Sequence, residues 1–346
     1  MSASPQLASP AARRAPAAGL ALLALALAPA AGAAEPGALT AASDGWRWRR
    51  GQVSVELRHR DARWSTAEAA AVGKALDRLP DGFLRKATAV ARVFYRDRHP
   101  RNESGPRGPN VTATTDAVAG YVSYGNSLLD GVDERRIYLT VTHELGHCAQ
   151  YAVIGGPVWL AKALAKTTGT PGWTAISWTS AITHGLKSWN GFVSDYARTN
   201  DREDFAESVE FYWVNPDGLR RVSPAKYAFM KAVVFDGVVS PAAARVASHD
   251  VIAPVRPVIE RLGDTVDTPG SLVKVHGKHF MGPLDGGYNT VRYRGTRTLH
   301  VPVSRTTVWS WVPPIKEGAA SVTVTTQDGR SAPADFRVKK PWWKFW

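Results

Sequence analysis

The chain has almost no cysteine. Cys148 is the only one among 346 residues. One thiol cannot form a disulfide within the chain, so a fold held together by disulfides is excluded. Stability must instead come from the burial of apolar side chains, for which a chain of this length has room in about two domains.

Long apolar runs are also missing. The run from Ala18 to Pro29 is too short for the roughly 20 residues of a membrane-spanning helix, and no later run approaches that length. Residues 1–33 contain no acid, carry the basic pair Arg13-Arg14 and end in Ala31-Gly32-Ala33. This pattern is typical of a secretory signal peptide removed after Ala33. We expect a monomer outside the cytosol, either extracellular or periplasmic.

Acidic residues are too few to balance the basic ones. The chain has 43 Lys and Arg against 30 Asp and Glu, a net charge of +13. A basic surface attracts anionic partners such as lipid or wall polymer. The charges are scattered, which equally fits a soluble basic surface with no particular partner, and secretion argues against nucleic acid.

The last eight residues, 339–346, are cationic and aromatic (KKPWWKFW). This composition prefers the interface between membrane and water. Packing against the preceding domain and a receptor-read sorting tag are the alternatives. Contact with the membrane interface is therefore one of three roles that the composition leaves open for this tail.

The order of the secondary-structure patterns predicts an α+β fold followed by a β-sandwich. Strand-like alternation in residues 52–59 precedes a helix that Ser65 opens, then strands over 90–95 and 117–124, and then two long helices. After about Val251, short strands alternate with Gly-containing turns. The predicted segments are a signal peptide (1–33), a disordered leader (34–45), an α+β domain (46–250), a sandwich (253–338) and the tail (339–346).

One motif carries chemistry. The first long helix contains His143-Glu144-Leu145-Gly146-His147, a His-Glu-x-x-His pattern. Four residues advance a helix by just over one turn, so both imidazoles project from one face and can bind one ion. Zinc suits two nitrogens and keeps a position open for water, and Glu144 can take the proton as that water attacks a carbonyl. The pattern predicts one Zn²⁺ ion with Glu144 as general base. Its alternative is two histidines that lie four apart by chance.

The third metal ligand is less well defined by the residues. No further His follows at close spacing, so a distant carboxylate is required. Glu203 and Glu207 lie four apart at the start of the second long helix and share a face. Glu203 also lies three residues after Asn200, where it could merely complete a capping box. The spacing alone leaves both interpretations open. Cys148 follows His147 directly, but it lies on the apolar stripe of the helix and is expected to pack inertly.

The site motifs together resemble a family. His143-Glu144-Leu145-Gly146-His147, Ser194-Asp195-Tyr196 and Glu203-Asp204-Phe205-Ala206-Glu207 look like the gluzincin-type zinc metallopeptidases related to anthrax lethal factor and the secreted Pro-Pro endopeptidases, over roughly residues 80–236. The resemblance implies a zincin-like fold with Glu203 as third zinc ligand and Glu207 as an acid that orients a ligand histidine. It also implies that Tyr196, seven residues before Glu203, donates a hydrogen bond to the oxyanion.

Two further features bear on the kind of peptidase. Residues 117–124 resemble the edge strand that receives an extended peptide in such enzymes; an ordinary covered strand is the alternative. No Gly-x-Met-Glu-Asn motif of aminopeptidases is present in the sequence. The expected activity is therefore that of an endopeptidase acting on a protein or peptide substrate.

The C-terminal segment resembles an IPT/TIG domain, an immunoglobulin-like sandwich. The resemblance is carried by Val273-Lys274-Val275-His276-Gly277, Val291-Arg292-Tyr293 and Val322-Thr323-Val324, together with Phe336. These are mostly turn and core positions, which indicate fold more than function.

The resulting prediction is a secreted zinc metalloendopeptidase. Metal held by His143, His147 and Glu203 would polarise water and carbonyl, while Glu144 moves the proton and Tyr196 supports the oxyanion. The alternative is a secreted binding or surface-associated protein that keeps a structural or vestigial zinc site. An acid at position 144 favours the enzyme, because a purely structural site needs no general base.

Overall fold

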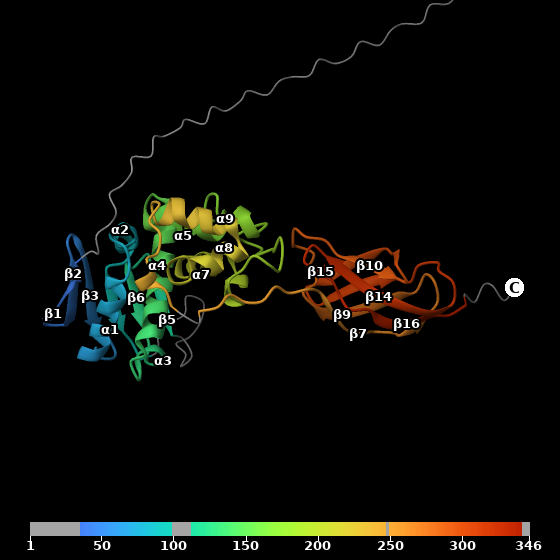
Figure 1. The fold of residues 1–346 in the computed structure, drawn as a ribbon, viewed down its shortest axis with the longest axis horizontal. Coiled ribbons are helices and arrows are strands. Elements are labelled where there is room, and N and C mark those ends of the chain that lie inside the picture. Colours follow the sequence, from blue (N-terminus) through green and yellow to red (C-terminus); the bar gives the residue numbers. More distant parts are fainter. Residues whose placement is uncertain (1–34, 99–111, 247–248, 341–346) are drawn as a thin grey trace, which may run out of the picture. The chain divides into compact units, whose positions relative to one another are not determined.

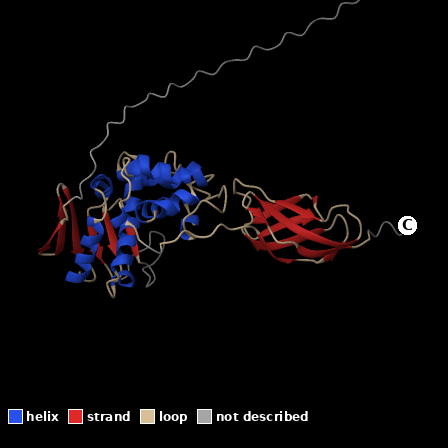
Figure 2. Ribbon diagram, in the orientation of Figure 1, coloured by secondary structure: helices blue, strands red, loops and turns tan. Residues whose placement is uncertain are grey.

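A computed structural model describes residues 35–98, 112–246 and 249–340 of the chain. The predicted signal peptide and all but two residues of the predicted tail lie outside the described residues. Within them the protein is mixed α and β, with three sheets and two separate hydrophobic cores (Figures 1 and 2). No helix among the described residues combines the length and apolar character needed to cross a membrane.

The first sheet has the order β1-β2-β3-β4-β6-β5. β3 and β4 run parallel, as do β4 and β6, and the remaining neighbours are antiparallel. Its strands are β1 Ala38–Ala42, β2 Gly45–Arg50, β3 Val53–His59, β4 Val93–Arg96, β5 Ala113–Asp116 and β6 Tyr121–Tyr124. The strand expected over 52–59 is thus present as β3.

The leader predicted over residues 34–45 is not disordered throughout. Ala38–Ala42 forms β1 and pairs with Gly45–Arg49 of β2. The reason is the tight turn at Ser43-Asp44, followed by Gly45 with φ +150°, where a Cβ would meet the carbonyl oxygen of Leu57. Asp-Gly is a strong hairpin signal. The small side chains of β1 lack the alternating pattern of apolar and polar residues by which a strand is predicted from sequence.

The strand predicted over residues 117–124 is also corrected. Residues 117–120 form a turn, with Gly120 at φ +76°, and only Tyr121–Tyr124 is strand. This strand, β6, lies between β4 and β5 and is therefore covered on both sides. On this side the described sheet ends at β5, so β5 rather than β6 is the edge strand here.

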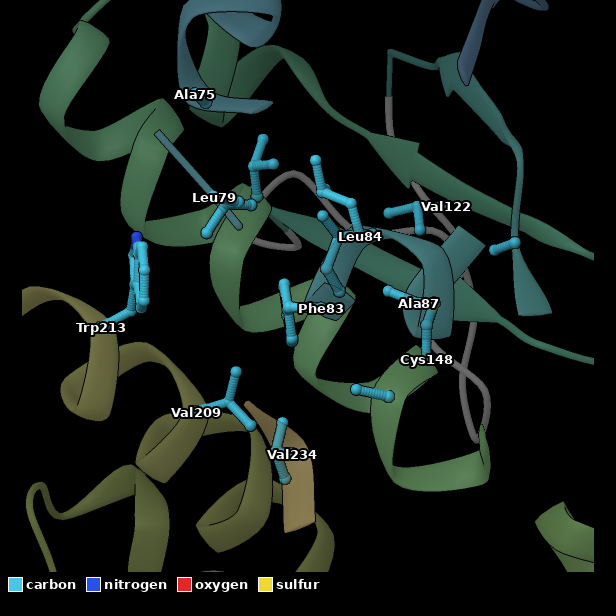
Figure 3. Packing of buried hydrophobic residues seen from close by; sticks show 14 of the residues in the cluster. Ala75, Leu79, Phe83, Leu84, Ala87, Val122, Cys148, Val209, Trp213 and Val234 are labelled. Atoms are coloured by element: carbon cyan, nitrogen blue, oxygen red, sulfur yellow. The ribbon is translucent and has the colours of Figure 1, made fainter. Parts of the chain in front are cut away.

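Helices pack around the sheet and bury its core. They are α1 Thr66–Asp77, α2 Asp81–Val90, α3 Asn126–Leu129, α4 Glu134–Ile154, α5 Val158–Thr167, α6 Thr174–Ser177, α7 Asp201–Val214, α8 Pro216–Val222 and α9 Pro224–Phe229, with the short turns η1 Tyr196–Arg198, η2 Met230–Val234 and η3 Ala242–Ala244. Ser65 caps α1 through a complete capping box with Glu68. Figure 3 shows Phe83 and Leu84 of α2, Cys148 of α4 and Val209 of α7 meeting in one core.

α4 and α7 cross at very close range. A Cβ added to Gly146 of α4 would lie 3.0 Å from the Cα of Ala206 and 3.2 Å from the Cβ of Val209, both on α7. A side chain at this position would require α7 to shift by a few tenths of an ångström, because the contact is tighter than nine in ten of those that real Cβ atoms make. The crossing brings the second half of the His-Glu-x-x-His motif against the helix that contains Glu203.

The second core lies between two β-sheets, as predicted for the C-terminal segment. One sheet has the order β11-β10-β14-β16-β8 with β15 on β14, and the other has the order β12-β13-β9-β7. Their strands are β7 Val258–Leu262, β8 Val266–Asp267, β9 Leu272–Lys278, β10 Thr290–Tyr293, β11 Thr296–Arg297, β12 His300–Ser304, β13 Thr307–Trp311, β14 Gly318–Thr326, β15 Gly329–Arg330 and β16 Ala334–Val338. Val275, Val322 and Phe336 are buried between them. Membership of the IPT/TIG family stays a prediction.

Candidate metal centre

α4 contains three of the predicted site residues. Asp133 caps its first turn by accepting from the backbone N–H groups of Arg135 and Arg136. The helix ends at Ile154, before Gly155 with φ +79°. His143 and His147 project from one face with ring centroids 4.9 Å apart, and Glu144 is buried beside them.

α7 brings the predicted third ligand to these rings. Glu203 Oε2 lies 3.3 Å from His143 Nε2 and 3.2 Å from His147 Nε2. Asn200 does cap α7, but its own side chain accepts from the backbone N–H groups of Arg202 and Glu203. Capping therefore leaves the Glu203 carboxylate free to face the histidines.

The spacing of the three ligand atoms fits a metal ion. Two atoms bound to one tetrahedral zinc at about 2.0–2.1 Å lie about 3.3 Å from each other. The two distances from Glu203 match that value, and Glu203 Oε2 is buried without a hydrogen-bond partner among the described residues. A buried carboxylate oxygen without a donor is costly unless a cation satisfies it. This buried His and Glu group can hold a metal ion.

The charges of the group act strongly on one another. Burial alone would lower the pKa of His143, but the carboxylates of Glu203 and Glu207 beside its ring raise that pKa well above the ordinary value. Burial alone would raise the pKa of Glu203, yet the neighbouring His147 and His143 lower it overall. The two carboxylates therefore favour the protonated form of His143 when no metal is bound, and a metal ion competes with that proton for the ring.

A second layer of side chains surrounds His143. Glu207 Oε1 lies 3.1 Å from His143 Nδ1, and Ser194 Oγ donates to Glu207 Oε2 at 2.6 Å. Glu210 Oε2 lies 3.9 Å from the same Nδ1, and Glu210 Oε1 lies 2.8 Å from His249 Nε2. The structure places Glu207 where the resemblance implies an orienting acid, because a carboxylate on Nδ1 leaves Nε2 available to a metal.

Sequence reasoning missed Glu210 and His249. Glu210 lies seven residues after Glu203, on the same face of α7, so its helical spacing was a usable signal. His249 lies beyond the helices in an irregular segment, and no local sequence pattern indicated that it would lie near the centre.

Thr115 on β5 was also missed. Its hydroxyl donates to Glu144 Oε2 at 2.6 Å, and both side chains are buried. This bond leaves the other carboxylate oxygen of Glu144 for a different partner. The edge strand of the sheet thereby fixes the orientation of the predicted general base.

Tyr196 stands at the open side of the centre. It begins the short turn η1, lies 53% exposed, and its ring centroid is 5.9 Å from that of His143. Partial burial, followed by the negative charges of Glu203 and Glu144, raises the pKa of its phenol. The hydroxyl therefore stays protonated at neutral pH and is able to donate a hydrogen bond.

A cleft of about 790 Å³ opens over these side chains. His143, Glu144, His147, Glu203 and Tyr196 all line it, together with residues 112–115 at the edge of the sheet. Metal ligands, acid and edge strand thus face one space large enough for part of a peptide.

Cys148 and His184, whose side chains could also bind metal, lie apart from this chemistry. Cys148 is fully buried, and burial raises the pKa of its thiol. His184, at φ +49°, packs its ring edge to face with Trp178 and does not line the cleft. Cys148 is packed as the sequence predicted, and His184 has a structural position.

Comparison with known proteins gives only distant likenesses. No family model and no curated protein matches the chain. Among solved structures, the Pro-Pro endopeptidase of Paenibacillus alvei is 16% identical over 51% of this chain and 96% of its own, with a TM-score of 0.33. The gamma-CGTase of an alkalophilic Bacillus clarkii is 28% identical, with a TM-score of 0.23, over 25% of this chain and 13% of that enzyme.

A third neighbour is an auxiliary nutrient binding protein from Bacteroides thetaiotaomicron. It is 16% identical, with a TM-score of 0.21, over 25% of this chain and 22% of its own. The chain therefore spans less than a quarter of this protein and of the gamma-CGTase. TM-scores of this size are too low to assign an activity, so the chemistry of the centre has to be judged from its own geometry.

Proposed function

We propose that the protein is a secreted zinc-dependent endopeptidase that binds one Zn²⁺ ion through His143, His147 and Glu203. The observation that supports this best is the convergence of Glu203 Oε2 on both histidine Nε2 atoms at 3.2–3.3 Å. Two imidazoles and one carboxylate form a donor set of the kind found in catalytic zinc sites that keep an open position. Oxygen-only cations such as Mg²⁺ and Ca²⁺ suit this set poorly.

The roles of the protein side chains follow from their positions. When bound, zinc would act as a Lewis acid that polarises a carbonyl and lowers the pKa of water. Glu144 accepts the proton of the water that attacks the peptide carbonyl, and then returns this proton to the leaving amine nitrogen. Thr115 keeps Glu144 in place through the 2.6 Å hydrogen bond. Tyr196 donates to the oxygen that becomes negative in the transition state.

The edge strand supplies a natural binding mode for the substrate. β5 pairs with β6 on one side, and its residues line the cleft on the other. An extended peptide can pair with such an edge through its backbone, which gives affinity without strict sequence choice. This role, which the sequence had indicated for residues 117–124, is now proposed for residues 113–116.

The alternative function is a binding protein with a structural zinc site. Such a site needs its ligands but no oriented carboxylate at an open cleft. Glu144 is held by Thr115 and lines that cleft. We therefore favour the enzyme.

The deciding experiment compares the wild-type protein with Glu144→Ala and the isosteric Glu144→Gln. Zinc content is measured by atomic emission, and cleavage with casein and a mixed peptide library. We expect one zinc per chain in all three proteins and cleavage by the wild type only. Cleavage retained by either variant would show that Glu144 is not the general base. Wild-type protein that binds zinc but cleaves nothing would favour the binding protein.

Location and surface contacts are part of the same proposal. The signal-like residues 1–33 support action outside the cytosol, and the basic aromatic tail supports contact with an anionic membrane surface. Deleting residues 339–346 is expected to reduce co-sedimentation with anionic vesicles. Undiminished binding would rule out the tail as a membrane contact.

A further inference from the structure

One sheet of the sandwich carries two tryptophans on its outer face. The sheet β12-β13-β9-β7 turns its other face to the second core. Along β13, Val308 and Ser310 are buried, whereas Trp309 is 37% exposed and Trp311 is half-buried. Alternate residues of a strand point to opposite faces, so both indole rings belong to the outer face, about 7 Å apart along the strand. The sheet thus presents an aromatic surface that its core does not use.

The strand register surrounds these rings with apolar and basic side chains. Val301 of β12 and Lys274 of β9 lie directly opposite Trp309, one on each side. Leu272 of β9 lies opposite Trp311. Lys274 Nζ is 5.9 Å from the centre of the Trp309 ring, and Val301, Lys274 and Leu272 are all exposed. Aromatic, apolar and cationic groups are therefore presented to solvent together.

The cations of this face outnumber its acids. The four strands contain Arg261, Lys274 and Lys278 but only one acid, Glu260, which lies 2.8 Å from Lys278. Among the described residues, no carboxylate forms an ion pair with Arg261 or Lys274. His276 lies opposite Arg261, and burial followed by the charges of Arg261 and Lys274 lowers its pKa. The uncompensated charge of the face is therefore positive, which favours an anionic partner.

The same charge limits what can cover the face. A second copy of the chain would bring Arg261 and Lys274 against the same cations, and the tail 339–346 is itself cationic. A peptide strand is disfavoured at the neighbouring edge, β12, because Pro302 has no N–H to donate and the register shifts between Pro302 and Ser304. The partner that fits is anionic and needs no backbone pairing.

The two indoles indicate the kind of anion. A sugar ring presents C–H groups on its face, and these pack against the electron-rich face of an indole. A glycan chain can lie along both rings while its acidic groups reach the cations beside them. Membrane contact instead requires apolar groups that sink about 5–10 Å into the headgroup boundary. Trp309 is mostly packed among its neighbours on the sheet, which suits a chain lying on the surface better than insertion.

We propose that the outer face of the sheet β12-β13-β9-β7 binds an acidic polysaccharide. Trp309 and Trp311 stack on its sugar rings, and Lys274 and Arg261 pair with its carboxylates. The site is separate from the metal centre and does not depend on the proposed peptidase function. Single ion pairs on an exposed surface are weak, so affinity comes from several units of the polymer binding at once.

The first experiment measures binding of three polymers to the full protein by isothermal titration calorimetry. Polygalacturonate offers sugar rings and carboxylates, dextran offers rings without charge, and polyglutamate offers charge without rings. We expect polygalacturonate to bind most tightly, with an affinity that falls as salt rises from about 50 to 500 mM. Absence of polygalacturonate binding, or equally tight binding of dextran or polyglutamate, overturns the proposal.

Substitutions then locate the binding. Trp309→Ala is expected to weaken polygalacturonate binding about tenfold, and Lys274→Glu about five- to tenfold. Trp159→Ala on α5 and Lys231→Glu on η2 make the same changes on exposed side chains outside the sandwich and should have no effect. Near-ultraviolet circular dichroism checks the fold of each variant. Lys274→Glu decides the outcome where Trp309→Ala fails to fold, and unchanged binding by Lys274→Glu overturns the proposal.

Two controls separate this face from other routes to an anionic surface. Polygalacturonate binding should persist when residues 339–346 are deleted, and its loss would assign the binding to the tail instead. Vesicles of phosphatidylglycerol should bind the wild type and Trp309→Ala equally. Vesicle binding that Trp309→Ala weakens, without polygalacturonate binding by the wild type, would make the face a membrane contact and overturn the glycan proposal.

Discussion

At the scale of single residues, the hydrogen bond from Thr115 to Glu144 has the most direct bearing on the proposed catalysis. The hydroxyl occupies one carboxylate oxygen of Glu144 at 2.6 Å and fixes the plane of the group. A general base works best when its geometry is set before the substrate arrives. The Thr115 hydroxyl bonds to Glu144 and to no proposed metal ligand, so we assign this side chain a positioning role.

Replacing Thr115 tests this role. Thr115→Val keeps the shape of the side chain but removes the donor, and we expect kcat to fall about 10- to 100-fold because the base is no longer held. KM and zinc content should change little. Thr115→Ser restores the hydroxyl and should recover most of kcat. Equal losses in the Ser and Val variants would mean that the side chain acts through packing alone.

The sequence predicts the residues of the centre to the extent that their signals are local. His143, Glu144 and His147 follow from a five-residue pattern on one helix. Glu203 needed the resemblance, because spacing alone could not separate a ligand from a cap. Thr115 and His249 carry no local signal, since a threonine on a short strand looks the same whether or not it meets a carboxylate from a distant helix.

At the scale of elements, the centre is built on the contact between α4 and α7. Glu203, Glu207 and Glu210 project from one side of α7 toward His143, while Phe205 and Val209 bury the other side. The helix thus supplies ligand and orienting acids from a single rigid element. Their relative positions depend on helix geometry rather than on loops.

Glu207→Gln should change metal binding in two separable ways. Loss of the carboxylate that orients His143 is expected to weaken zinc affinity about 10- to 100-fold at neutral pH. Glu207 also raises the pKa of His143 in the metal-free protein. Protons compete with zinc for that ring as pH falls, so in the variant, where the pKa is lower, the loss of binding should begin at a lower pH.

Chelator competition from pH 5.5 to 8 measures both effects. Wild-type affinity is expected to fall as pH decreases toward and below the raised pKa of His143. A variant with unchanged zinc affinity and an unchanged pH profile would show that Glu207 neither orients the His143 ring nor raises its pKa. Ser194→Ala, which removes only the donor to Glu207, is the milder control.

α7 is anchored by a fully buried ion pair. Lys226 Nζ lies 2.7 Å from Asp204 Oδ1, both side chains are 0% exposed, and Trp178 donates to the other carboxylate oxygen. Burial raises the pKa of Asp204 and lowers that of Lys226 even within the pair. Asp204 immediately follows Glu203, so the pair also fixes the backbone of a ligand.

Breaking the pair should be costly. Lys226→Met leaves Asp204 buried without its partner, and we expect the free energy of unfolding to fall by about 3–5 kcal/mol. The exposed Lys231→Met on η2 should change it by no more than about 0.5 kcal/mol. Urea unfolding followed by tryptophan fluorescence measures both. Comparable small losses in the two variants would contradict a structural role for the pair.

Elements with strong periodicity were predicted well and short ones were not. α1 and α7 begin directly after Ser65 and Asn200, the cap residues that the sequence indicated. Asp133, which caps α4, is an equally local signal that the sequence prediction did not include. The strand expected over 90–95 is shifted to Val93–Arg96, since Val90 still belongs to α2. Four-residue strands such as β5 and β6 are defined by their pairing partners, which the sequence does not reveal.

At the scale of the whole molecule, the described part of the chain has two cores and one candidate metal centre. The first core surrounds the centre, and the second lies between the sheets of the sandwich. The alternation of β9 and the Gly-containing turns made the sandwich predictable as an architecture. These sequence patterns do not indicate what the sandwich binds.

Metal removal should therefore act on one part of the protein. A ligand that binds only the folded state stabilises it by about 4 kcal/mol at 1,000 times its dissociation constant. We expect calorimetry to show two transitions, of which a chelator lowers only the one that belongs to the first core, by several degrees. Restoring zinc should reverse the shift. Equal shifts of both transitions would show that the two cores unfold together.

The glycine at the helix crossing has an evolutionary consequence. Gly146 lies inside the metal-binding motif, yet its size is limited by Ala206, sixty residues further along the chain. A side chain gained at 146 has to be matched by a rearrangement around 206, or the ligand Glu203 moves with its helix. Substitutions at 146 and around 206 are therefore expected to depend on one another, because each sets how much room the other has.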